Sequence, residues 1–346
     1  MGEAPQLFTD VARWYAVSTV ALGLRTGLLD ALMGPAGGAA TNGRTAAELA
    51  GAAGTDEDAT ARWADAMVTA GYATKQDGRY APVDEALKAL QPGSMGPRAI
   101  VELLVSAGGL LPRTAAAIED GAGIGSDELQ AALGITPERV NIPMYQRLLL
   151  SEWIEGHPEI KAALEAGASV AEVGPGGGTA LRILAGAFPS SQFRGCDLDP
   201  RIVAEANAAA AAEGLTNVSF EVLDARNLPK GAFDLVCMFD AFHHVTDPDG
   251  VLAGMRAALR PGGSLLLAEV ALSGDPTEDA ADPTAVIVYG SDLVYCYQES
   301  KVAGRPGMGA TWAGRGLDAL LARHGFTETG RVTSRGGYIV VRAVPA

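Results

Sequence analysis

The sequence predicts an α/β protein with a doubly wound, Rossmann-like sheet of seven strands, an antiparallel terminal hairpin and an amino-terminal, mainly α-helical domain. From Ala166 onward, short apolar runs alternate with helical stretches, which is typical of βαβ units and a parallel sheet. The last two extended runs, 326–333 and 336–342, have no helix between them, so they must pair as an antiparallel hairpin. Before residue 90, Ala and Leu recur at the three- and four-residue spacings of helices.

Composition limits the class of protein. The chain has 346 residues, of which 48% are hydrophobic and 19% charged, as expected of a globular protein long enough for two domains. Its net charge of −15 disfavours nucleic acid and anionic membranes as partners, because both require surplus Lys and Arg. Solubility alone explains the negative charge. We therefore expect no nucleic-acid partner and no membrane partner.

Cysteine usage and the amino terminus favour a cytoplasmic protein. Cys196, Cys237 and Cys296 show no CxxC spacing, which favours reduced thiols over disulfides. The first residues lack a basic segment followed by an apolar one, so no signal peptide is expected. No apolar run approaches the ~20 residues that span a bilayer, so no transmembrane helix is expected.

The amino-terminal region has the outline of a winged helix. Thr45-Ala-Ala-Glu48 is a capping box for a short helix that ends near Gly54. Residues 56–58 are acidic and begin a longer helix that ends at Gly71, and a hairpin is expected around Asp77-Gly78. Winged helices bind DNA or dimerise. Because the helix that would read DNA begins with three acidic residues, dimerisation is favoured here.

A homodimer through this region is a second expectation. The apolar stretch 11–24 places Trp14, Val17, Ala21 and Leu24 on one helical stripe. An exposed stripe of this kind favours a partner copy. The alternative interpretation is that the stripe packs inside its own domain.

The expected sheet is built from short β-rich runs. A turn at 260–263 is expected to precede the fifth run, and the acidic, glycine-rich segment 118–128 is expected to be a loop. The five parallel strands are expected at 169–173, 192–196, 218–222, 233–239 and 264–270.

A glycine-rich loop follows the first of these strands. Val170-Ala-Glu-Val-Gly-Pro-Gly-Gly-Gly-Thr179 places glycines at 174, 176 and 178, and a helix is expected to begin at Thr179. A nucleoside cofactor needs such a loop, because Cβ atoms would keep the backbone away from it. The dinucleotide fingerprint requires its third glycine where Thr179 stands, so pyrophosphate binding is disfavoured.

Acidic residues follow the next three strands. Asp197 follows the second strand, about 20 residues after the loop, where a carboxylate accepts ribose hydroxyls. Asp224 follows the third strand and offers an acceptor for an adenine amine, and Asp240 follows the fourth. Singly, each could be a helix cap. Jointly they line the crevice where doubly wound sheets bind ligands.

With these motifs, residues 165–345 resemble class I methyltransferases that use S-adenosylmethionine (SAM), and the whole chain resembles bacterial small-molecule methyltransferases similar in plan to plant-type O-methyltransferases. The resemblance implies dimerisation through the amino-terminal domain. It also implies that the three glycines contact the methionine part of SAM, Asp197 the ribose, and Asp224 with Ala225 the adenine. Glu172 stands where Asp is commoner in the family. The full set of expected cofactor contacts is Glu172, Gly174, Gly176, Gly178, Asp197, Leu198, Asp224, Ala225 and Asp240.

The resemblance divides the chain into three parts. Residues 1–95 are expected to form a winged-helix-like dimerisation domain, and 96–165 to form connecting helices at a substrate pocket. Residues 166–346 are expected to form the SAM-binding catalytic domain. The expected activity is methyl transfer to a small molecule, with O-methylation favoured and C-methylation next.

His243 is the candidate general base, because the pKa of an ordinary imidazole suits proton abstraction near neutral pH. It matches the position of the base in plant-type O-methyltransferases. His244 replaces the Asp that follows the base in that family, so another carboxylate must orient His243. Glu269, at the end of the fifth strand, is the candidate by topology. The alternative is that His243 only ties the loop to the backbone.

The substrate itself is not encoded in a pattern. Candidate contacts come from the connecting helices and the segment 280–305: Tyr145, Arg147, His244, Tyr289 and Tyr295. For the tyrosines, partial burial in a helix face is the alternative. No metal is expected, because adjacent histidines rarely chelate one ion. A SAM-binding transcriptional regulator and a nicotinamide-dependent oxidoreductase are the alternative functions.

Overall fold

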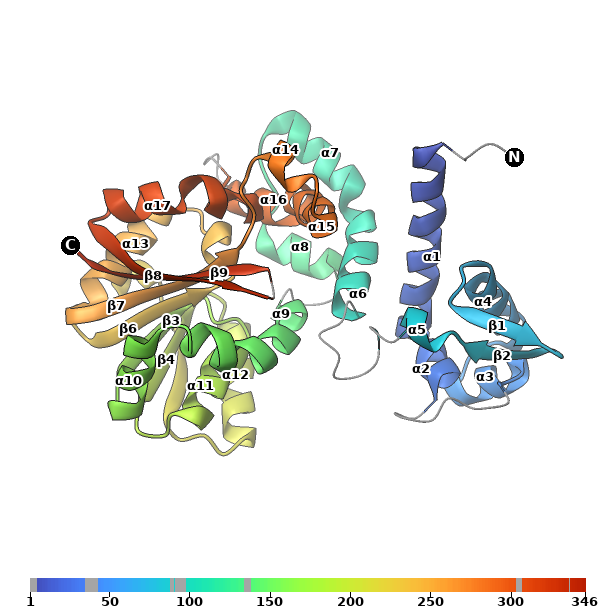
Figure 1. Cartoon of the computed structure of the whole chain (residues 1–346), viewed down its shortest axis with the longest axis horizontal. Helices are drawn as coiled ribbons and strands as arrows, with labels where there is room; N and C mark the ends of the chain where they lie inside the picture. Colours follow the sequence, from blue (N-terminus) through green and yellow to red (C-terminus); the bar gives the residue numbers. More distant parts are fainter. Residues whose placement is uncertain are drawn as a thin grey trace. The chain divides into compact units, whose positions relative to one another are not determined.

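The computed structural model describes residues 5–34, 43–87, 90, 98–133, 138–302, 307–335 and 337–346 (Figure 1). The chain forms two compact units, Met1–Gly109 and Leu110–Ala346. The boundary lies within the segment 96–165 that was expected to connect the domains. The predicted three-part division stays a prediction.

The first unit contains helices and one two-stranded sheet. Its elements are α1 (Gln6–Thr26), α2 (Leu28–Met33), α3 (Ala46–Ala53), α4 (Glu57–Thr69), β1 (Ala73–Gln76), β2 (Arg79–Pro82), α5 (Asp84–Leu87) and α6 (Arg98–Ala107). The predicted capping box is present, since Glu48 N–H donates to Thr45 Oγ1 at 3.2 Å and Thr45 N–H donates to Glu48 Oε2 at 2.8 Å. The predicted hairpin pairs β1 with β2 antiparallel.

The apolar stripe expected on α1 lies partly inside this unit. Ala21 and Leu24 are buried in its core, so the stripe that was expected to be exposed is wrong at these two residues. The stripe is exposed at Trp14, and the other large apolar residues exposed on α1 lie outside the stripe. The exposed large apolar residues of α1 are Leu7, Phe8, Val11, Trp14, Tyr15 and Leu22.

The second unit begins with helices that precede the sheet. These are α7 (Leu111–Asp120), α8 (Ser126–Leu133), α9 (Glu138–Met144), the π-helical segment η3 (Tyr145–Ile154) and α10 (Pro158–Ala166). The loop expected over 118–128 is shorter, because α7 continues to Asp120 and α8 begins at Ser126. Gly121, with a left-handed φ of 69°, ends α7.

The sheet has seven strands in the order β5-β4-β3-β6-β7-β9-β8. The strands are β3 (Ser169–Val173), β4 (Gln192–Asp197), β5 (Val218–Val222), β6 (Phe233–Phe239), β7 (Leu259–Val270), β8 (Phe326–Ser334) and β9 (Tyr338–Pro345). The first five are parallel, and β9 pairs antiparallel with both β7 and β8. The predicted fold class is confirmed.

One strand boundary differs from the prediction. β7 begins at Leu259, opposite Phe233, and includes the 260–263 segment that was expected to be a turn. Gly336, the expected first residue of the last strand, lies outside the described residues.

Helices cover both faces of the sheet, as Figure 1 shows. On one face, α10, α11 (Thr179–Ala187) and α12 (Pro200–Ala212) pack through one core cluster. On the other face, α13 (Pro248–Ala258) and α17 (Ala313–Arg323) pack through a second. Shorter elements follow the strands: η4 (Ala225–Asn227), η5 (Phe242–His244), α14 (Pro276–Asp279), α15 (Pro283–Ser291), η6 (Asp292–Cys296), α16 (Tyr297–Ser300) and η8 (Ala310–Trp312).

Trp153 is the central aromatic residue of the first cluster. Its side chain is fully buried, and its ring centroid lies 5.5–5.8 Å from those of Tyr145, Phe239 and Tyr338. These rings lie beneath the carboxyl end of β6. Packing around Trp153 therefore supports the loop that follows this strand.

One helical run, Arg98–Asp120, is long and apolar enough to cross a membrane by length and composition. It has 23 residues and a mean hydropathy of 1.3 over its most apolar window. The expectation that no apolar stretch approaches this length was wrong. Length and composition alone are weak evidence for a membrane span, and the run includes the 3-10 turn η2 (Gly108–Leu110).

Candidate functional site

The glycine loop joins β3 to α11. Gly174, Gly176 and Gly178 have left-handed φ angles of 63°, 55° and 75°, which side chains with a Cβ rarely adopt. A Cβ at Gly178 would also lie 2.3 Å from the ring of Phe220, which is buried beneath the loop. Glycine is therefore required here by both backbone angle and space. Apart from the buried Pro175, the loop consists of glycines, so it presents mainly backbone to whatever binds above it.

Asp197 ends β4 beside this loop. Its Oδ1 accepts a hydrogen bond from Asp199 N–H at 3.0 Å. Burial raises the pKa of Asp197, while hydrogen bonds from the backbone of Asp199, Leu198 and Gly176 act in the opposite direction. The next residue, Leu198, is 70% exposed. Backbone hydrogen bonds thus fix the Asp197 carboxylate at the carboxyl end of β4, next to an exposed apolar side chain.

Asp224 and Ala225 follow β5. Asp224 Oδ1 accepts the Arg226 N–H at 2.9 Å, and its Oδ2 binds the Arg226 guanidinium at 2.5 Å. The Arg226 guanidinium holds the pKa of Asp224 below its ordinary value. Ala225 is buried, and Glu172, within β3, is buried as well. The residues expected at adenine, ribose and methionine therefore follow adjacent strands in the order β5, β4, β3.

The next strand along the sheet, β6, leads to His243. Its Nδ1 lies 2.6 Å from Glu269 Oε2, and Glu269 Oε1 accepts Phe242 N–H at 2.9 Å. Both side chains are almost fully buried. The topology predicted this proximity correctly: His243 follows β6, and Glu269 is near the end of the neighbouring β7.

The electrostatics of His243 favour its charged form. Burial lowers the pKa of His243, but the charge and hydrogen bond of Glu269, together with the charges of Asp240 and Asp292, outweigh it and raise the pKa to about 9. The Glu269 carboxylate therefore orients the ring and makes it a stronger base. Since Nδ1 is bound to Glu269, Nε2 is the nitrogen left for a proton transfer.

Asp240 is the first residue after β6. Its φ is 51°, in the left-handed region, and its N–H donates to Ala268 O at 2.8 Å. The Asn141 side-chain amide donates to Asp240 Oδ2 at 2.6 Å, and Tyr338 OH lies 3.5 Å from Asn141 Oδ1. Asn141 and Tyr338 were not predicted at the site. They lie 99 and 98 residues from Asp240 in the sequence, and no local motif marks either of them.

His244 belongs to a second network, which is only partly buried. Its Nδ1 lies 2.7 Å from Glu299 Oε2. Burial and the neighbouring His243 lower the pKa of His244, whereas Cys296 and Glu299 raise it, to about 10 overall. The Tyr295 ring stands edge-on to the His244 ring at 5.4 Å. The structure thus brings together two residues that were expected at the substrate and links them to Glu299.

The remaining expected substrate contacts lie in different surroundings. Tyr145 is buried and its hydroxyl donates to Phe239 O at 3.3 Å. Tyr289 donates to Asp279 Oδ2 at 2.9 Å, and Arg147 is exposed. A contact of any of these residues with a substrate stays a prediction.

Donor atoms at the site are close enough together to admit a cation. The donor atoms lie within 4.8 Å of one another in each of two groups: Asp240, His243 and Glu269, and His243, His244 and Cys296. However, His243 Nδ1 is bound to Glu269 and His244 Nδ1 to Glu299. The expectation that no metal takes part stays a prediction.

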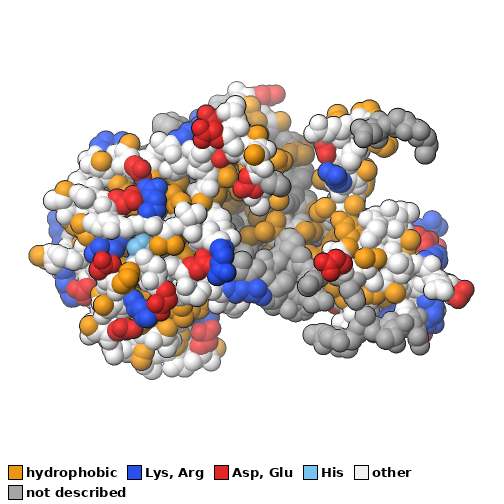
Figure 2. Space-filling view, viewed as in Figure 1, with side chains coloured by type: hydrophobic (Ala, Val, Ile, Leu, Met, Phe, Trp, Pro, Cys, Tyr) orange, Lys and Arg blue, Asp and Glu red, His pale blue; other side chains and the backbone are white. Residues whose placement is uncertain are grey.

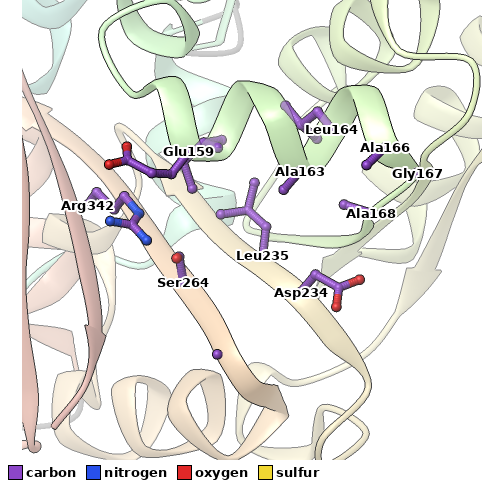
Figure 3. Close-up of a pocket in the computed structure, with 12 residues that line it drawn as sticks. Glu159, Ala163, Leu164, Ala166, Gly167, Ala168, Asp234, Leu235, Ser264 and Arg342 are labelled. Atoms are coloured by element: carbon purple, nitrogen blue, oxygen red, sulfur yellow. The ribbon is translucent and has the colours of Figure 1, made fainter.

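A separate hollow of about 440 Å³ lies near the opposite ends of the parallel strands (Figure 3). It is bordered by α10 and by Asp234, Ser264 and Arg342. Asp234 Oδ2 accepts the Ser169 N–H and binds Arg260, each at 2.8 Å. Doubly wound sheets bind ligands at the carboxyl ends of their strands, so this hollow is not part of the candidate site.

Part of the sheet-forming region matches a known domain family. Residues 170–263 match the family described as "Methyltransferase domain". The match begins in β3, includes the glycine loop and Asp197, and ends in β7. These residues therefore form a methyltransferase domain, and the resemblance predicted from the motifs is confirmed for this part of the chain.

Individual proteins that are similar to this chain are also methyltransferases. Methyltransferase GfsG of Streptomyces halstedii is 31% identical over 153 residues, which cover 43% of this chain and 49% of that protein. The chain thus matches about half the length of this curated relative. The human N-acetylserotonin methyltransferase structure with SAM has a TM-score of 0.67 at 18% identity and covers 100% of both chains.

A second solved structure covers both units. The O-methyltransferase NcsB1 from neocarzinostatin biosynthesis, in complex with SAM and 2-hydroxy-5-methyl naphthoic acid, has a TM-score of 0.63. It is 20% identical and covers 100% of this chain and 99% of its own. At these identities the two structures show that the fold is shared.

Proposed function

We propose that the protein transfers the methyl group of SAM to a hydroxyl oxygen of a small molecule in secondary metabolism. The methyltransferase domain at 170–263 supports methyl transfer. The observation that favours oxygen as the acceptor atom is the buried His243–Glu269 pair at 2.6 Å. A hydroxyl acceptor must lose its proton to a base, whereas the sulfonium leaving group is already activated and needs no acid. C-methylation of an acidic carbon would use the same base and is the nearest alternative.

The residues present fit SAM as the cofactor. The left-handed glycines at 174, 176 and 178 would contact its methionine part, and the Asp197 carboxylate would accept its ribose hydroxyls. Leu198, Asp224 and Ala225 would surround the adenine, with Glu172 buried behind the loop. SAM, when bound, supplies a methyl group already activated on a sulfonium. The protein's task is then chiefly to align the acceptor and remove its proton.

His243 would remove that proton through Nε2. Glu269 fixes the tautomer and orientation of the ring by binding Nδ1, so it acts as a positioning residue. Only the neutral imidazole accepts a proton. Because the pKa of His243 is raised to about 9, the reaction should speed up as the pH increases toward that value.

The acceptor is proposed to be a small molecule on the basis of relatives. NcsB1 was solved with a hydroxylated naphthoic acid, and other similar structures come from mitomycin and calicheamicin biosynthesis. His244, Tyr295, Tyr289, Tyr145 and Arg147 remain the candidate acceptor contacts. For His244 and Tyr295 these contacts would be indirect, through the Glu299 network.

The test is methylation of a panel of hydroxylated aromatic compounds with labelled SAM, followed by mass spectrometry. His243→Asn should lower the rate by about 100-fold or more while SAM binding is retained, which is the usual contribution of a general base. His324→Asn is the matched control, because His324 binds Asp249 at the surface. Equal rates for His243→Asn and the wild type would contradict the assignment of the base.

We also propose a homodimer that forms through a winged-helix-like amino-terminal domain. Supporting this, α1 exposes six large apolar side chains, among them Phe8 at 68% and Tyr15 at 64%. Figure 2 shows hydrophobic side chains on the visible face of this unit. Light scattering of the wild type at micromolar concentration should give a dimer, and the double variant Phe8→Glu/Tyr15→Glu a monomer. Val286→Glu, at an exposed position in the other unit, is the control. A monomeric wild type would contradict the proposal.

A cytoplasmic, reducing location is proposed because Cys196, Cys237 and Cys296 are all free thiols. A DNA-binding regulator is the competing function for the amino-terminal domain. Against it, Asp56 caps α4 by accepting Ala59 N–H at 2.9 Å, and Glu57 and Asp58 add negative charge to its first turn. A gel-shift assay with random DNA at low salt distinguishes the two functions.

A further inference from the structure

Asp240 adjoins the glycine loop. β6 lies next to β3 in the sheet, and Ala241, directly after Asp240, is the nearest neighbour of a Cβ built at Gly174, at 3.4 Å. On the proposed function, adenine, ribose and methionine lie above β5, β4 and β3 in that order. The reactive end of the cofactor therefore points toward β6, where Asp240 and His243 follow the strand.

The backbone at Asp240 is held in an unfavourable conformation. In the described part of the chain, Asp77 and Asp240 are the non-glycine residues with left-handed φ angles. Asp77 is in the β1–β2 turn, where this conformation is ordinary. Asp240 instead ends a central strand and remains bound to Ala268 O. Strain of this kind persists where the surrounding structure enforces it, often at functional sites.

The Asp240 side chain is half-buried beside other charged groups, and its Oδ1 atom is fully buried. Oδ2 accepts the Asn141 amide at 2.6 Å, whereas Oδ1 is buried without a well-formed hydrogen bond among the described residues. The Tyr338 hydroxyl also interacts with this carboxylate. Burying a carboxylate oxygen in this state is costly unless a cation or a hydrogen-bond donor pairs with it.

The charges at the site do not balance. Donor atoms of Asp240, Glu269 and His243 lie within 4.8 Å of one another, so two carboxylates face one imidazole. With both carboxylates ionised, the cluster carries one net negative charge when His243 is protonated and two when His243 is neutral. Burial raises the pKa of Asp240, so a nearby cation would help to keep this carboxylate ionised. His244 does not correct this imbalance, because it is paired with Glu299. The cluster therefore favours an additional monocation.

We propose that the Asp240 carboxylate is the counter-ion of the cofactor's sulfonium, so that the site distinguishes SAM from its demethylated product, S-adenosylhomocysteine (SAH), by charge. This inference rests on the proposed function and assigns a role to one residue within it. Asp240 supplies binding energy to the cationic cofactor that the neutral product does not receive.

The same two carboxylates would stabilise the positive charge throughout the reaction. The acceptor oxygen forms a bond to the methyl carbon, the electrons of the broken C–S bond remain on sulfur, and His243 Nε2 takes the hydroxyl proton. Positive charge thus moves from the sulfonium to the imidazolium. The carboxylates of Asp240 and Glu269 would stabilise this charge first on the sulfonium and then on the imidazolium, and the net charge of the site would be the same before and after transfer.

The test is calorimetric measurement of the dissociation constants of SAM and SAH. Asp240→Asn keeps the side-chain shape, and Asn tolerates left-handed φ angles. Asp240→Asn should raise the dissociation constant of SAM by about tenfold or more, as expected for loss of a charged partner. The dissociation constant of SAH should stay within about twofold of the wild-type value. The matched control is Asp197→Asn, the same substitution at the ribose. It should weaken both ligands equally and leave their ratio unchanged.

Other outcomes separate this inference from the proposed function. A wild type that binds neither ligand contradicts the proposed function itself. A wild type that binds both, with an unchanged SAM-to-SAH ratio in Asp240→Asn, overturns only the assignment of the counter-ion. If Asp240→Asn does not fold, Asp240→Gly is the substitute, because it removes the charge and the backbone strain together. Asp240→Gly must then show the same change in the SAM-to-SAH ratio.

Discussion

Replacing Glu269 by Gln tests the electrostatics of the His243–Glu269 pair directly. The Glu269 side chain is fully buried and accepts two hydrogen bonds, from Phe242 N–H at 2.9 Å and from His243 Nδ1 at 2.6 Å. Gln keeps the shape and one acceptor oxygen but removes the charge. The substitution therefore separates orientation of the ring from stabilisation of its charged form.

The expected magnitude follows from the pKa of His243. The difference between an ordinary 6.5 and about 9 corresponds to about 3 kcal/mol in favour of the imidazolium, at 1.36 kcal/mol per pKa unit. In Glu269→Gln the charge of Glu269 is gone, while burial still disfavours the charged ring. We expect the pKa of His243 to fall by about two units or more. At pH 7 the ring would change from mostly protonated to mostly neutral.

The assay is NMR titration of histidine-labelled protein, which requires no knowledge of the acceptor. The chain has four histidines, so His243→Asn assigns its signal by difference. His244 is the internal control: its pKa, raised to about 10, depends on Cys296 and Glu299 and should stay high in Glu269→Gln. A wild-type midpoint near 6.5, or a midpoint near 9 that is unchanged by the substitution, would refute the reasoning.

Two further predictions concern the scaffold of the site. Trp153→Ala should lower the free energy of unfolding by about 3–5 kcal/mol in urea denaturation, because it leaves a large cavity beneath β6, whereas Val286→Ala, at a position 74% exposed, should cost less than about 0.5 kcal/mol. Equal losses would contradict the packing described here. Gly178→Ala should destabilise the protein more than Gly214→Ala, because both have left-handed φ angles but only the first Cβ meets Phe220, at 2.3 Å. Equal melting temperatures of the two variants would exclude that clash.

The sequence predicted the parts of the fold that depend on local pattern. Apolar runs bounded by turn residues gave the limits of β3, β5 and β6 as the structure has them. The boundary of β7 was placed late, because Gly262 and its neighbours have the composition of a turn yet continue a strand paired with β6. Composition alone does not distinguish a glycine that ends an element from one inside it.

The candidate site was predictable where topology decides position. His243 and Glu269 were placed together because adjacent parallel strands bring their carboxyl ends to one edge of the sheet. Asn141 and Tyr338 were missed, because they reach Asp240 from α9 and β9 through tertiary packing alone. The prediction that the α1 stripe is exposed was wrong at two of its four residues for a related reason. Helical periodicity groups residues on one face of a helix but does not show what covers that face.

The central claim is that the glycine loop and Asp197 hold SAM, and calorimetric titration of SAM into the wild type and Asp197→Ala tests it most directly. The wild type should bind one SAM per chain. The variant should lose about 1.5–3 kcal/mol of binding free energy, because Asp197 is a charged acceptor at the carboxyl end of β4. Absence of SAM binding by the wild type, or equal affinity in the two proteins, would contradict the account.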